Sequence, residues 1–306
     1  MDAQTDFLAR RLSSGRQPLT IGLFDSGVGG LTVLRELENA LGEICSPAAI
    51  ELVYIGDTLR CPYGDRSAAE ISEFASQSAR WLVNRGANYL IIACNTSASL
   101  AGDLLRQDSP VPVYDLIAPA ARAAARAGGS IAVLSTTATA RSRAFTKAIR
   151  AVNPAACVIE IACPKLVPLI EAGQIEAADT IAALKEYTSP VLQQRSNCIV
   201  FGCTHYPFLR KALARLLPEE TGFIDPASAL VCELLGIAVS DSLPTSDAPS
   251  RSSRCPTSIF TTGNPDSFAA TARACLGFAT GPVHPIALDQ ISAPYAMPTA
   301  STGRHG

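Results

Sequence analysis

Two cysteines occupy the same kind of position, at the point where an apolar run gives way to polar residues. Cys94 ends the run in "LIIACNTSASL", and Cys203 ends the run in "CIVFGCTHYPFL". A thiolate is a base as well as a nucleophile, although only about 3% of a free thiol with a pKa near 8.5 is ionised at pH 7. Two thiols on opposite faces of one carbon can invert a stereocentre, because one removes a proton and the other returns a proton to the opposite face. The pair therefore predicts proton transfer at carbon.

Neutral hydrogen-bonding groups accompany the two cysteines. Asn95, Thr96, Thr204, Ser26 and Thr136 can donate to a substrate carboxylate, and no lysine follows either cysteine. These residue types therefore favour a small carboxylate as the substrate.

Short β-branched runs predict the elements that position these residues. We expect buried strands at residues 19–25, 50–56, 89–93, 131–135, 157–162 and 198–202. Helical patterns lie between them, and the clearest covers residues 68–85, where Ser67 and Glu70 form a capping box and Gly86 ends the helix. This alternation predicts an α/β fold with right-handed crossovers and mostly parallel sheets. In such sheets the chemistry collects at the carboxyl ends of the strands, where both cysteines are expected to lie.

The two halves of the chain also resemble one another. "IGLFDSGVGGLTVLREL" from Ile21 matches the pattern of "IAVLSTTATARSRAFTKAI" from Ile131, an offset of 110 residues, and the two cysteines are offset by 109 residues. The near-equal spacing indicates a duplicated α/β unit. Two related domains that face one another would place Cys94 and Cys203 on opposite walls of one cleft.

Composition narrows the class of protein. The chain has 306 residues, of which 48% are hydrophobic and 17% are charged, and a net charge of −2, which predicts a globular protein with two domains. The 25 basic residues form no run, so nucleic acid is not expected as a partner, and no apolar run approaches the roughly 20 residues that span a membrane. The start of the chain does not read as a secretory signal, so we expect a cytoplasmic protein whose ten cysteines are mostly reduced and hold no structural metal.

Four motifs together resemble a known family. "GLFDSGVGGLTVLREL", "YIGDTLRCPYGDRS", "IIACNTSA" and "IVFGCTHYPFL" are similar to the signatures of the bacterial glutamate racemases, which belong to the aspartate/glutamate racemase superfamily. The resemblance runs from about residue 20 to about residue 284 and includes "FIDPA" and "FTTGNPDSF". It implies a cofactor-independent isomerase that interconverts L-glutamate and D-glutamate by two-cysteine acid/base catalysis. Such an enzyme supplies D-glutamate for peptidoglycan synthesis, and so for cell wall biogenesis and cell shape.

The resemblance also implies a division of the chain. A first α/β domain covers residues 20–112 plus 222–284, and a second α/β domain is inserted at residues 113–221. The two domains are expected to be pseudo-symmetric and doubly wound, with the active site in the cleft between them. Polar tails at residues 1–19 and 285–306 and a loop at residues 240–254 fall outside the pattern, and we expect them to be flexible. No cofactor and no metal are implied, the expected partner is the substrate glutamate, and the sequence leaves a homodimer open.

The resemblance implies site residues position by position. Cys94 and Cys203 become the acid/base pair, and Asp25 and His205 are expected to assist them, one on each side. The implied substrate pocket contains Asp25, Ser26, Asp57, Pro62, Tyr63, Gly64, Asn95, Thr96, Thr136, Thr139, Thr204 and His205. Glu171 also matches an acidic residue of the family. The chain departs from the commoner pattern at Leu59, at Cys61 and at Ala138, which replaces a glycine.

Three of these residues also have a structural interpretation. Asp25 can cap the helix that begins near Leu31, although the "SGVGG" turn after it is typical of backbone N–H groups that face a bound anion. His205 can be a structural histidine, although an imidazole with a pKa near 6.5 suits proton transfer. Asp57 can simply end its strand.

Two other classes of protein are alternatives. A dinucleotide-binding oxidoreductase fits the glycine-rich turn, but Thr32 stands where the fingerprint G-x-G-x-x-G requires its third glycine. A non-enzymatic binding or redox-sensing protein on the same scaffold would use Cys94 and Cys203 without turnover of amino acids. A pyridoxal phosphate racemase is disfavoured, because none of the lysines at 147, 165, 185 and 211 lies in the four motifs.

Overall fold

Two parallel sheets form the framework of the protein. The computed structural model describes residues 19–44, 50–236, 255–277 and 279–293. Within these residues, a six-stranded sheet has the order β10-β9-β2-β1-β3-β4, and a four-stranded sheet has the order β6-β5-β7-β8. Adjacent strands run parallel in both sheets. The larger sheet contains β1 (Leu19–Asp25), β2 (Ile50–Gly56), β3 (Tyr89–Ile92), β4 (Val113–Asp115), β9 (Thr257–Thr261) and β10 (Val283–Pro285). The smaller sheet contains β5 (Ser130–Ser135), β6 (Cys157–Ala162), β7 (Cys198–Gly202) and β8 (Gly222–Ile224).

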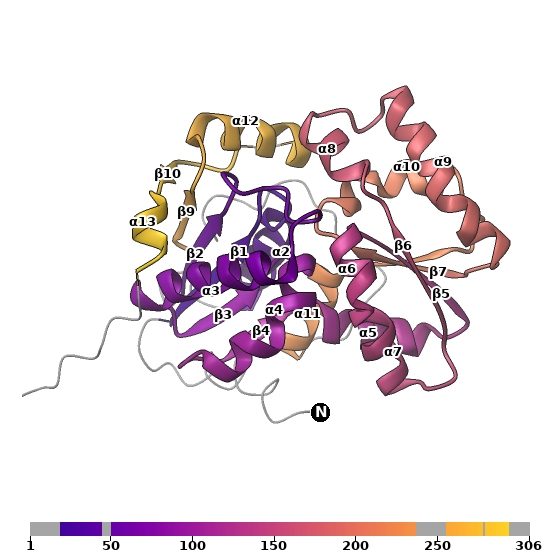
Figure 1. The fold of residues 1–306 in the computed structure, drawn as a ribbon, viewed down its shortest axis with the longest axis horizontal. Coiled ribbons are helices and arrows are strands. Elements are labelled where there is room, and N and C mark those ends of the chain that lie inside the picture. The colour runs from indigo at the N-terminus through magenta and orange to yellow at the C-terminus, as the bar shows by residue number, and fades with distance from the viewer. Residues whose placement is uncertain (1–18, 45–49, 237–254, 278, 294–306) are drawn as a thin grey trace, which may run out of the picture.

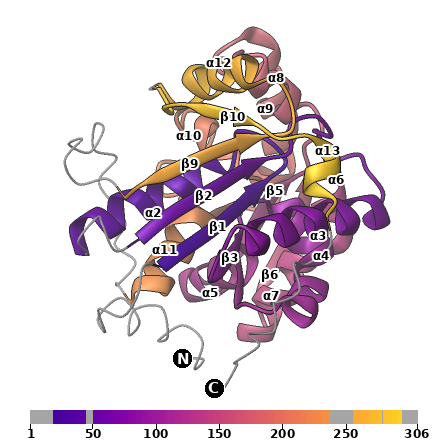
Figure 2. The same ribbon diagram turned by 90° about the vertical axis from the view of Figure 1, so that its left-hand side faces the viewer.

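Helices follow the strands and cover both faces of each sheet (Figures 1 and 2). In the first part of the chain these are α2 (Leu31–Ile44), α3 (Ala68–Asn84), α4 (Asn95–Asp108), α5 (Ile117–Ala127), α6 (Thr137–Ser142) and α7 (Ala144–Val152). They continue with α8 (Leu166–Glu171), α9 (Ala178–Gln193), the 3₁₀ helix η2 (Tyr206–Leu209), α10 (Arg210–Ala214), α11 (Pro226–Leu235), α12 (Pro265–Leu276) and α13 (Leu288–Ile291).

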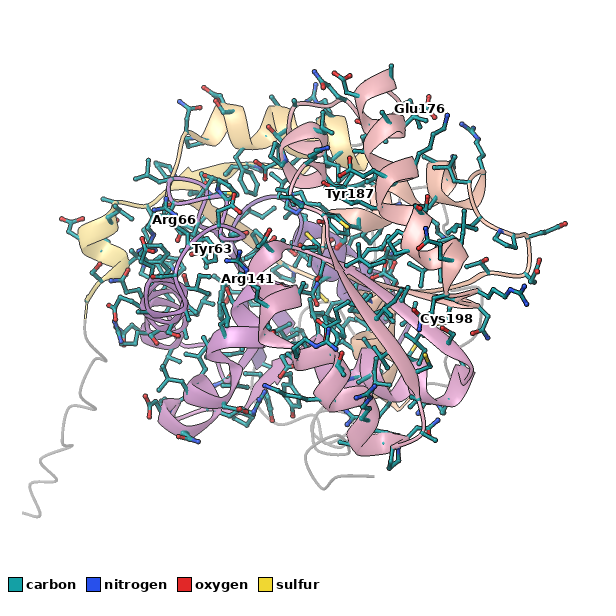
Figure 3. All side chains as sticks on the ribbon, turned by 45° about the vertical axis from the view of Figure 1, so that its right-hand side comes forward. Tyr63, Arg66, Arg141, Glu176, Tyr187 and Cys198 are labelled. Carbon is teal, nitrogen blue, oxygen red and sulfur yellow. The ribbon has the colours of Figure 1, made fainter. Side chains whose placement is uncertain are left out.

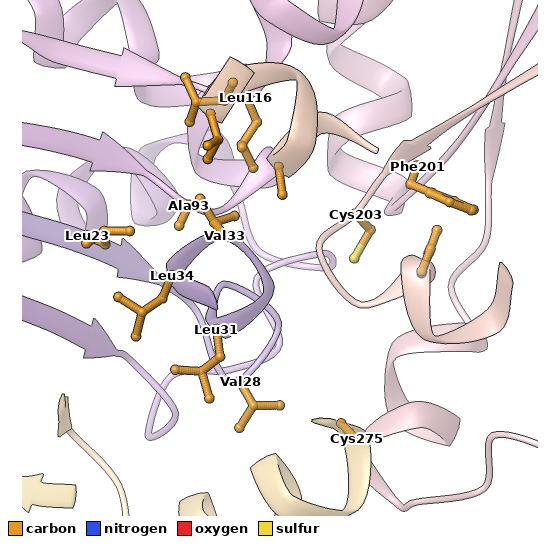
Figure 4. Close-up of a cluster of buried hydrophobic side chains, with 14 of the residues drawn as sticks. Leu23, Val28, Leu31, Val33, Leu34, Ala93, Leu116, Phe201, Cys203 and Cys275 are labelled. Carbon is orange, nitrogen blue, oxygen red and sulfur yellow. The ribbon is translucent and has the colours of Figure 1, made fainter. Parts of the chain in front are cut away.

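Alternate residues of the central strands enter different apolar clusters. In β1, Leu23 packs in one cluster with Leu34 of α2, whereas Phe24 packs in the other with Leu82 of α3. Because both faces are buried, the strands read as continuous apolar runs rather than as alternating patterns. The first cluster extends from the larger sheet to the smaller one, where it includes Phe201 and Cys203 (Figure 4). The predicted doubly wound α/β fold is therefore confirmed.

The predicted strands and the predicted helix agree closely with the structure. Four of the six predicted strands have the observed limits, and the strands at residues 89–92 and 130–135 differ from the prediction by one residue each. Ser67 is the N-cap of helix α3 and forms the predicted capping box with Glu70 in its first turn. Gly86 follows the end of the helix with a φ of +91°.

The strand order repeats in the two sheets. The order β2-β1-β3-β4 in the larger sheet corresponds to β6-β5-β7-β8 in the smaller one. The residue after β2, Asp57, donates its N–H to the carbonyl of Asp25 (2.9 Å), and the residue after β6, Cys163, donates its N–H to the carbonyl of Ser135 (2.8 Å). Asp57 is therefore the structural counterpart of Cys163, and Asp25 is the counterpart of Ser135. The observed order supports the duplication that the sequence spacing indicates.

The repeat also includes the two points where the chain passes from one sheet to the other. Asp115 ends β4 and accepts a hydrogen bond from the N–H of Ile117 (2.7 Å), and Asp225 follows β8 and accepts one from the N–H of Ala227 (2.9 Å). These aspartates lie 110 residues apart. Each caps a helix that packs against the other half: α5 lies against α7, and α11 lies against α2.

Two short strands pair in a different sheet from the one that the predicted domain limits imply. The strand at residues 113–115 pairs with β3 in the larger sheet, and the strand at residues 222–224 pairs with β7 in the smaller sheet. Each was expected in the other domain, so the changes of sheet come about three residues later in the chain than predicted.

The predicted C-terminal tail is wrong for its first residues. Residues 285–293 include the end of β10 and helix α13, and Ile286 and Ile291 are buried. Leu19, placed in the N-terminal tail, begins β1. The rest of both tails and the loop at residues 240–254 lie outside the described residues.

Candidate active site

A cavity lies between the carboxyl ends of the two sheets. Asp25 at the end of β1 lines it, together with residues of the loops and helices that follow strands of both sheets. The lining residues are Asp25, Ser26, Cys61, Pro62, Tyr63, Gly64, Asp65, Cys94, Asn95, Thr96, Thr136, Thr137, Cys163, Pro164, Val167, Pro168, Cys203, Thr204 and His205. The cavity therefore contains both cysteines that the sequence singled out, one after β3 and one after β7.

Most of the predicted site residues line this cavity, but three do not. Asp57, Thr139 and Glu171 lie behind the lining and contact residues that do line it. The sequence prediction missed a set of lining residues, namely Cys61, Asp65, Thr137, Cys163, Pro164, Val167 and Pro168. The internal repeat could have identified Cys163, because Cys163 is the counterpart of Asp57, which was itself a predicted site residue.

On the first wall, Asp25 is a buried carboxylate that the glycine-rich turn surrounds. Its side chain is 1% exposed and accepts hydrogen bonds from the backbone N–H groups of Ser26 (2.8 Å) and Gly30. Burial raises the pKa of Asp25, although the charge of His205 and these N–H groups oppose the rise. Two N–H groups of the turn thus bind Asp25, where the sequence had predicted that they face a bound anion.

Cys94 lies beside this carboxylate. It occupies the N-cap position of α4 without a side-chain cap, and its Sγ lies 3.9 Å from the hydroxyl of Ser26. Burial and then the charge of Asp25 raise the pKa of Cys94 to about 12. Cys94 is therefore a thiol at neutral pH, with a carboxylate next to it that can take its proton.

On the second wall, Cys203 begins a chain of three side chains. Its Sγ lies 3.8 Å from Nδ1 of His205, and Nε2 of His205 lies 3.0 Å from Oε1 of Glu171. Burial alone would lower the pKa of His205, but the bonds to Cys203 and Glu171 outweigh it and raise that pKa well above its ordinary value. Burial likewise opposes ionisation of Glu171, yet the bond to His205 leaves its pKa lowered. An imidazolium with a carboxylate behind it thus faces Cys203.

Neutral polar groups complete the cavity. The hydroxyls of Thr96, Thr136 and Thr139 form a closed ring with O···O distances of 2.9, 3.0 and 3.2 Å, which joins the two halves of the protein. The amide of Asn95 is 2% exposed, and neither its Nδ2 nor its Oδ1 has a partner in the described part of the chain. A buried amide without partners is costly, so Asn95 is suited to bind a ligand. The lining contains no lysine and no arginine.

The two walls touch at a glycine. A Cβ at Gly29 would lie 2.4 Å from Oγ1 of Thr204 and 2.5 Å from Nδ1 of His205, closer than van der Waals contact permits. Only glycine fits here, so the turn after β1 can lie directly against the loop after β7.

Across the described ranges, no group of three or more His, Cys, Asp or Glu side chains is arranged to hold a metal ion. In the same part of the chain, no helix is both long enough and apolar enough to cross a membrane.

Comparison with known proteins identifies similar chains. Residues 21–234 match the family described as Asp/Glu/hydantoin racemase. A glutamate racemase of Gloeobacter violaceus is 41% identical over 256 residues, which cover 83% of this chain and 91% of that protein. Among solved structures, a glutamate racemase isoform from Bacillus anthracis has a TM-score of 0.77 at 30% identity, covering 88% of this chain and 98% of its own. The glutamate racemase of Francisella tularensis in complex with D-glutamate has a TM-score of 0.75 at 28% identity, and the match covers 90% of this chain and 99% of that chain.

The raised pKa of Cys94 predicts how its alkylation depends on pH. With a pKa of about 12, the thiolate fraction, and with it the rate of alkylation by iodoacetamide, should rise about tenfold per pH unit from pH 7 to pH 10. Because the charge of Asp25 contributes to this pKa, Asp25→Asn should lower it and speed the alkylation of Cys94 at pH 8. Peptide mapping by mass spectrometry measures the rate, with the exposed Cys157 as internal reference. A plateau for Cys94 below pH 9 would contradict the assignment.

Proposed function

The chain belongs to the Asp/Glu/hydantoin racemase family, and from that premise we propose that it interconverts L-glutamate and D-glutamate by two-cysteine acid/base catalysis without a cofactor. The observation that carries the proposal is the pair of thiols on opposite walls of one cavity, each beside its own buried proton-handling group. The names of the relatives supply the substrate, because the chain covers most of their length.

In the direction that begins at the first wall, Asp25 takes the proton of Cys94. The resulting thiolate removes the proton from Cα of the substrate, and the electron pair stays on the substrate as a carbanion next to the α-carboxylate. Cys203 then donates its thiol proton to the opposite face of Cα. His205 restores that proton, and Glu171 holds the imidazolium in place. The reverse reaction exchanges the roles of the two thiols.

The burial of the first wall supports this division of labour. A thiol with a pKa of about 12 is a poor base by itself, so Cys94 needs an acceptor, and the raised pKa of Asp25 makes its carboxylate a better one. On the second wall a histidine beside Cys203 can both donate and accept a proton. The two walls therefore perform the same proton transfer with different assistants.

Neutral donors orient the substrate. The unpartnered amide of Asn95, the hydroxyls of Thr96, Thr136 and Thr204 and the N-terminal end of α4 can hold the carboxylates of glutamate. Asp25 and His205 also lie within reach of a bound amino acid. We expect the enzyme to act in the cytoplasm and to supply D-glutamate for peptidoglycan.

A chirality assay tests the proposed reaction. Purified protein from which pyridoxal phosphate has been removed should convert L-glutamate to a racemic mixture, and it should leave L-aspartate unchanged or convert it far more slowly. Chiral chromatography measures both products over time. Turnover that requires added pyridoxal phosphate, or that favours aspartate, would overturn the proposal.

Replacing either proposed base should remove nearly all activity. Cys94→Ser and Cys203→Ser should each lower kcat/KM about a thousandfold or more, because a serine hydroxyl is far too weak an acid to exchange protons with Cα at neutral pH. Cys157→Ser is the matched control, since Cys157 is exposed and remote from the cavity, and it should keep the wild-type rate. If either cavity variant retained a tenth of the activity, the two-thiol mechanism would be wrong.

Isotope labelling distinguishes two bases from one. When L-glutamate is converted in D₂O, the early D-glutamate should carry deuterium at Cα, because the thiol on the far wall has exchanged with solvent, while the remaining L-glutamate stays largely unlabelled. The pattern should invert when D-glutamate is the substrate. Proton NMR of the Cα–H signal after chiral separation, at a few per cent conversion, measures both pools. Early product that kept its Cα hydrogen would indicate one base that shuttles a single proton.

A further inference from the structure

Asp57 is a charged side chain buried outside the cavity. It is 0% exposed, and its carboxylate accepts hydrogen bonds from Nε of Arg60 (2.6 Å), from Oγ1 of Thr262 (2.7 Å) and from the phenol of Tyr63. A buried carboxylate is stable only when such donors surround it, so this residue organises the groups around it. Asp57 was predicted to lie in the substrate pocket, but it does not line the cavity and so does not contact a molecule bound there directly.

Tyr63 connects this carboxylate to the first wall. Its side chain is 2% exposed, lines the cavity and packs in one apolar cluster with Ile71 and Cys94. Burial and then the charge of Asp57 raise the pKa of Tyr63, so the phenol keeps its proton and donates it to Asp57. Figure 3 labels Tyr63 near the boundary between the two halves, where the carbonyl of the next residue, Gly64, accepts the N–H of Ala138 (3.1 Å).

A second support fixes the same ring from outside. The guanidinium of Arg60 lies 4.1 Å from the centroid of the Phe74 ring, and the rings of Phe74 and Tyr63 have centroids 5.6 Å apart. Arg60 thus joins Asp57 through its Nε and reaches Tyr63 through Phe74. The hydroxyl of Tyr63 is therefore hydrogen-bonded to Asp57, and the ring of Tyr63 packs against that of Phe74.

We propose that Asp57 is a positioning residue, which accepts a hydrogen bond from the phenol of Tyr63 and thereby holds the Tyr63 ring against the thiol of Cys94. The kinetic part of this inference rests on the proposed racemase function. The thiol of Cys94 must approach Cα of a substrate along one line, and an ordered ring on one side removes the freedom to turn away from it.

The other wall lacks this device. The counterpart of Asp57 is Cys163, which lines the cavity itself, and the buried phenol near it, Tyr206, donates to the backbone carbonyl of Cys163 (3.0 Å). No carboxylate stands at that position. Loss of the Asp57–Tyr63 bond should therefore disturb Cys94 and leave Cys203 as it is.

Two variants test the proposal in the intact protein. Asp57→Asn removes the charge, and Tyr63→Phe keeps the ring but removes the donor. Each should lower kcat for glutamate about tenfold to a hundredfold while KM stays within about threefold, because the lost bond orients a reacting group and does not bind substrate. Each should also speed the alkylation of Cys94 by iodoacetamide about fivefold or more, with the alkylation of Cys203 unchanged within about twofold, because a freed ring exposes only the first thiol.

A tyrosine outside the cavity lining provides the control. Tyr114→Phe removes a phenol from the same sheet, at β4, and should leave kcat and both alkylation rates within about twofold of wild type. If Asp57→Asn does not fold, as judged by its melting temperature, Tyr63→Phe decides. Unchanged kcat in Tyr63→Phe, a rise in KM alone, or equal acceleration at both cysteines would each overturn the proposal. If the wild type does not racemise glutamate, the proposed function fails, and the selective change at Cys94 still judges the positioning role.

Discussion

The contact between the glycine-rich turn after β1 and the loop after β7 sets the distance between the two walls of the site. The turn belongs to the larger sheet, the loop belongs to the smaller one, and at Gly29 there is no room for a Cβ against Thr204 and His205. Cys94 follows β3, the neighbour of β1 in the larger sheet, and Cys203 begins the loop after β7 itself. A side chain at Gly29 would therefore separate the thiols as well as the walls. A displacement of about 1 Å at reacting groups can cost about a hundredfold in rate, so this contact constrains the chemistry as well as the packing.

A second constraint is electrostatic. The cavity lining contains two aspartates and one histidine but no lysine or arginine, and its deepest carboxylate, Asp25, is buried. Backbone N–H groups balance Asp25 in part, and His205 balances Glu171. Because these donors are already used, the proposed dicarboxylate substrate would bind to neutral amides, hydroxyls and a helix end. Burial and the charge of Asp25 raise the pKa of Cys94 to about 12, so this thiol keeps its proton at neutral pH.

Much of the framework could be predicted from the sequence because it depends on local patterns. The long apolar strands and the Ser67 capping box have signals within a few residues of each other, and the two cysteine motifs mark the strand ends. The strands at residues 113–115 and 222–224 are too short to give a periodic signal, and they pair in the sheets that β3 and β7 belong to, about three residues beyond the predicted limits. The same holds for β10 and α13, whose burial depends on packing against distant elements. Contacts between residues far apart in the chain have no local signal either, which explains why Asp57, Thr139 and Glu171 were expected in the cavity rather than behind it.

The duplicated scaffold and its divergence answer different demands of one reaction. The proposed inversion at Cα needs a proton donor and acceptor on each face, and the repeated order of strands places Cys94 and Cys203 at equivalent positions. The substrate itself is chiral, however, and its carboxylates must stay fixed while only the hydrogen changes face. A site with identical walls would hold those carboxylates equally well in two orientations. The halves therefore have to differ away from the thiols, and they do: Asp25 corresponds to Ser135, and Asp57 corresponds to Cys163. In the proposed reaction, duplication thus accounts for two acids on opposite faces, and the substitutions at the neighbouring strand ends account for one orientation of the substrate between them.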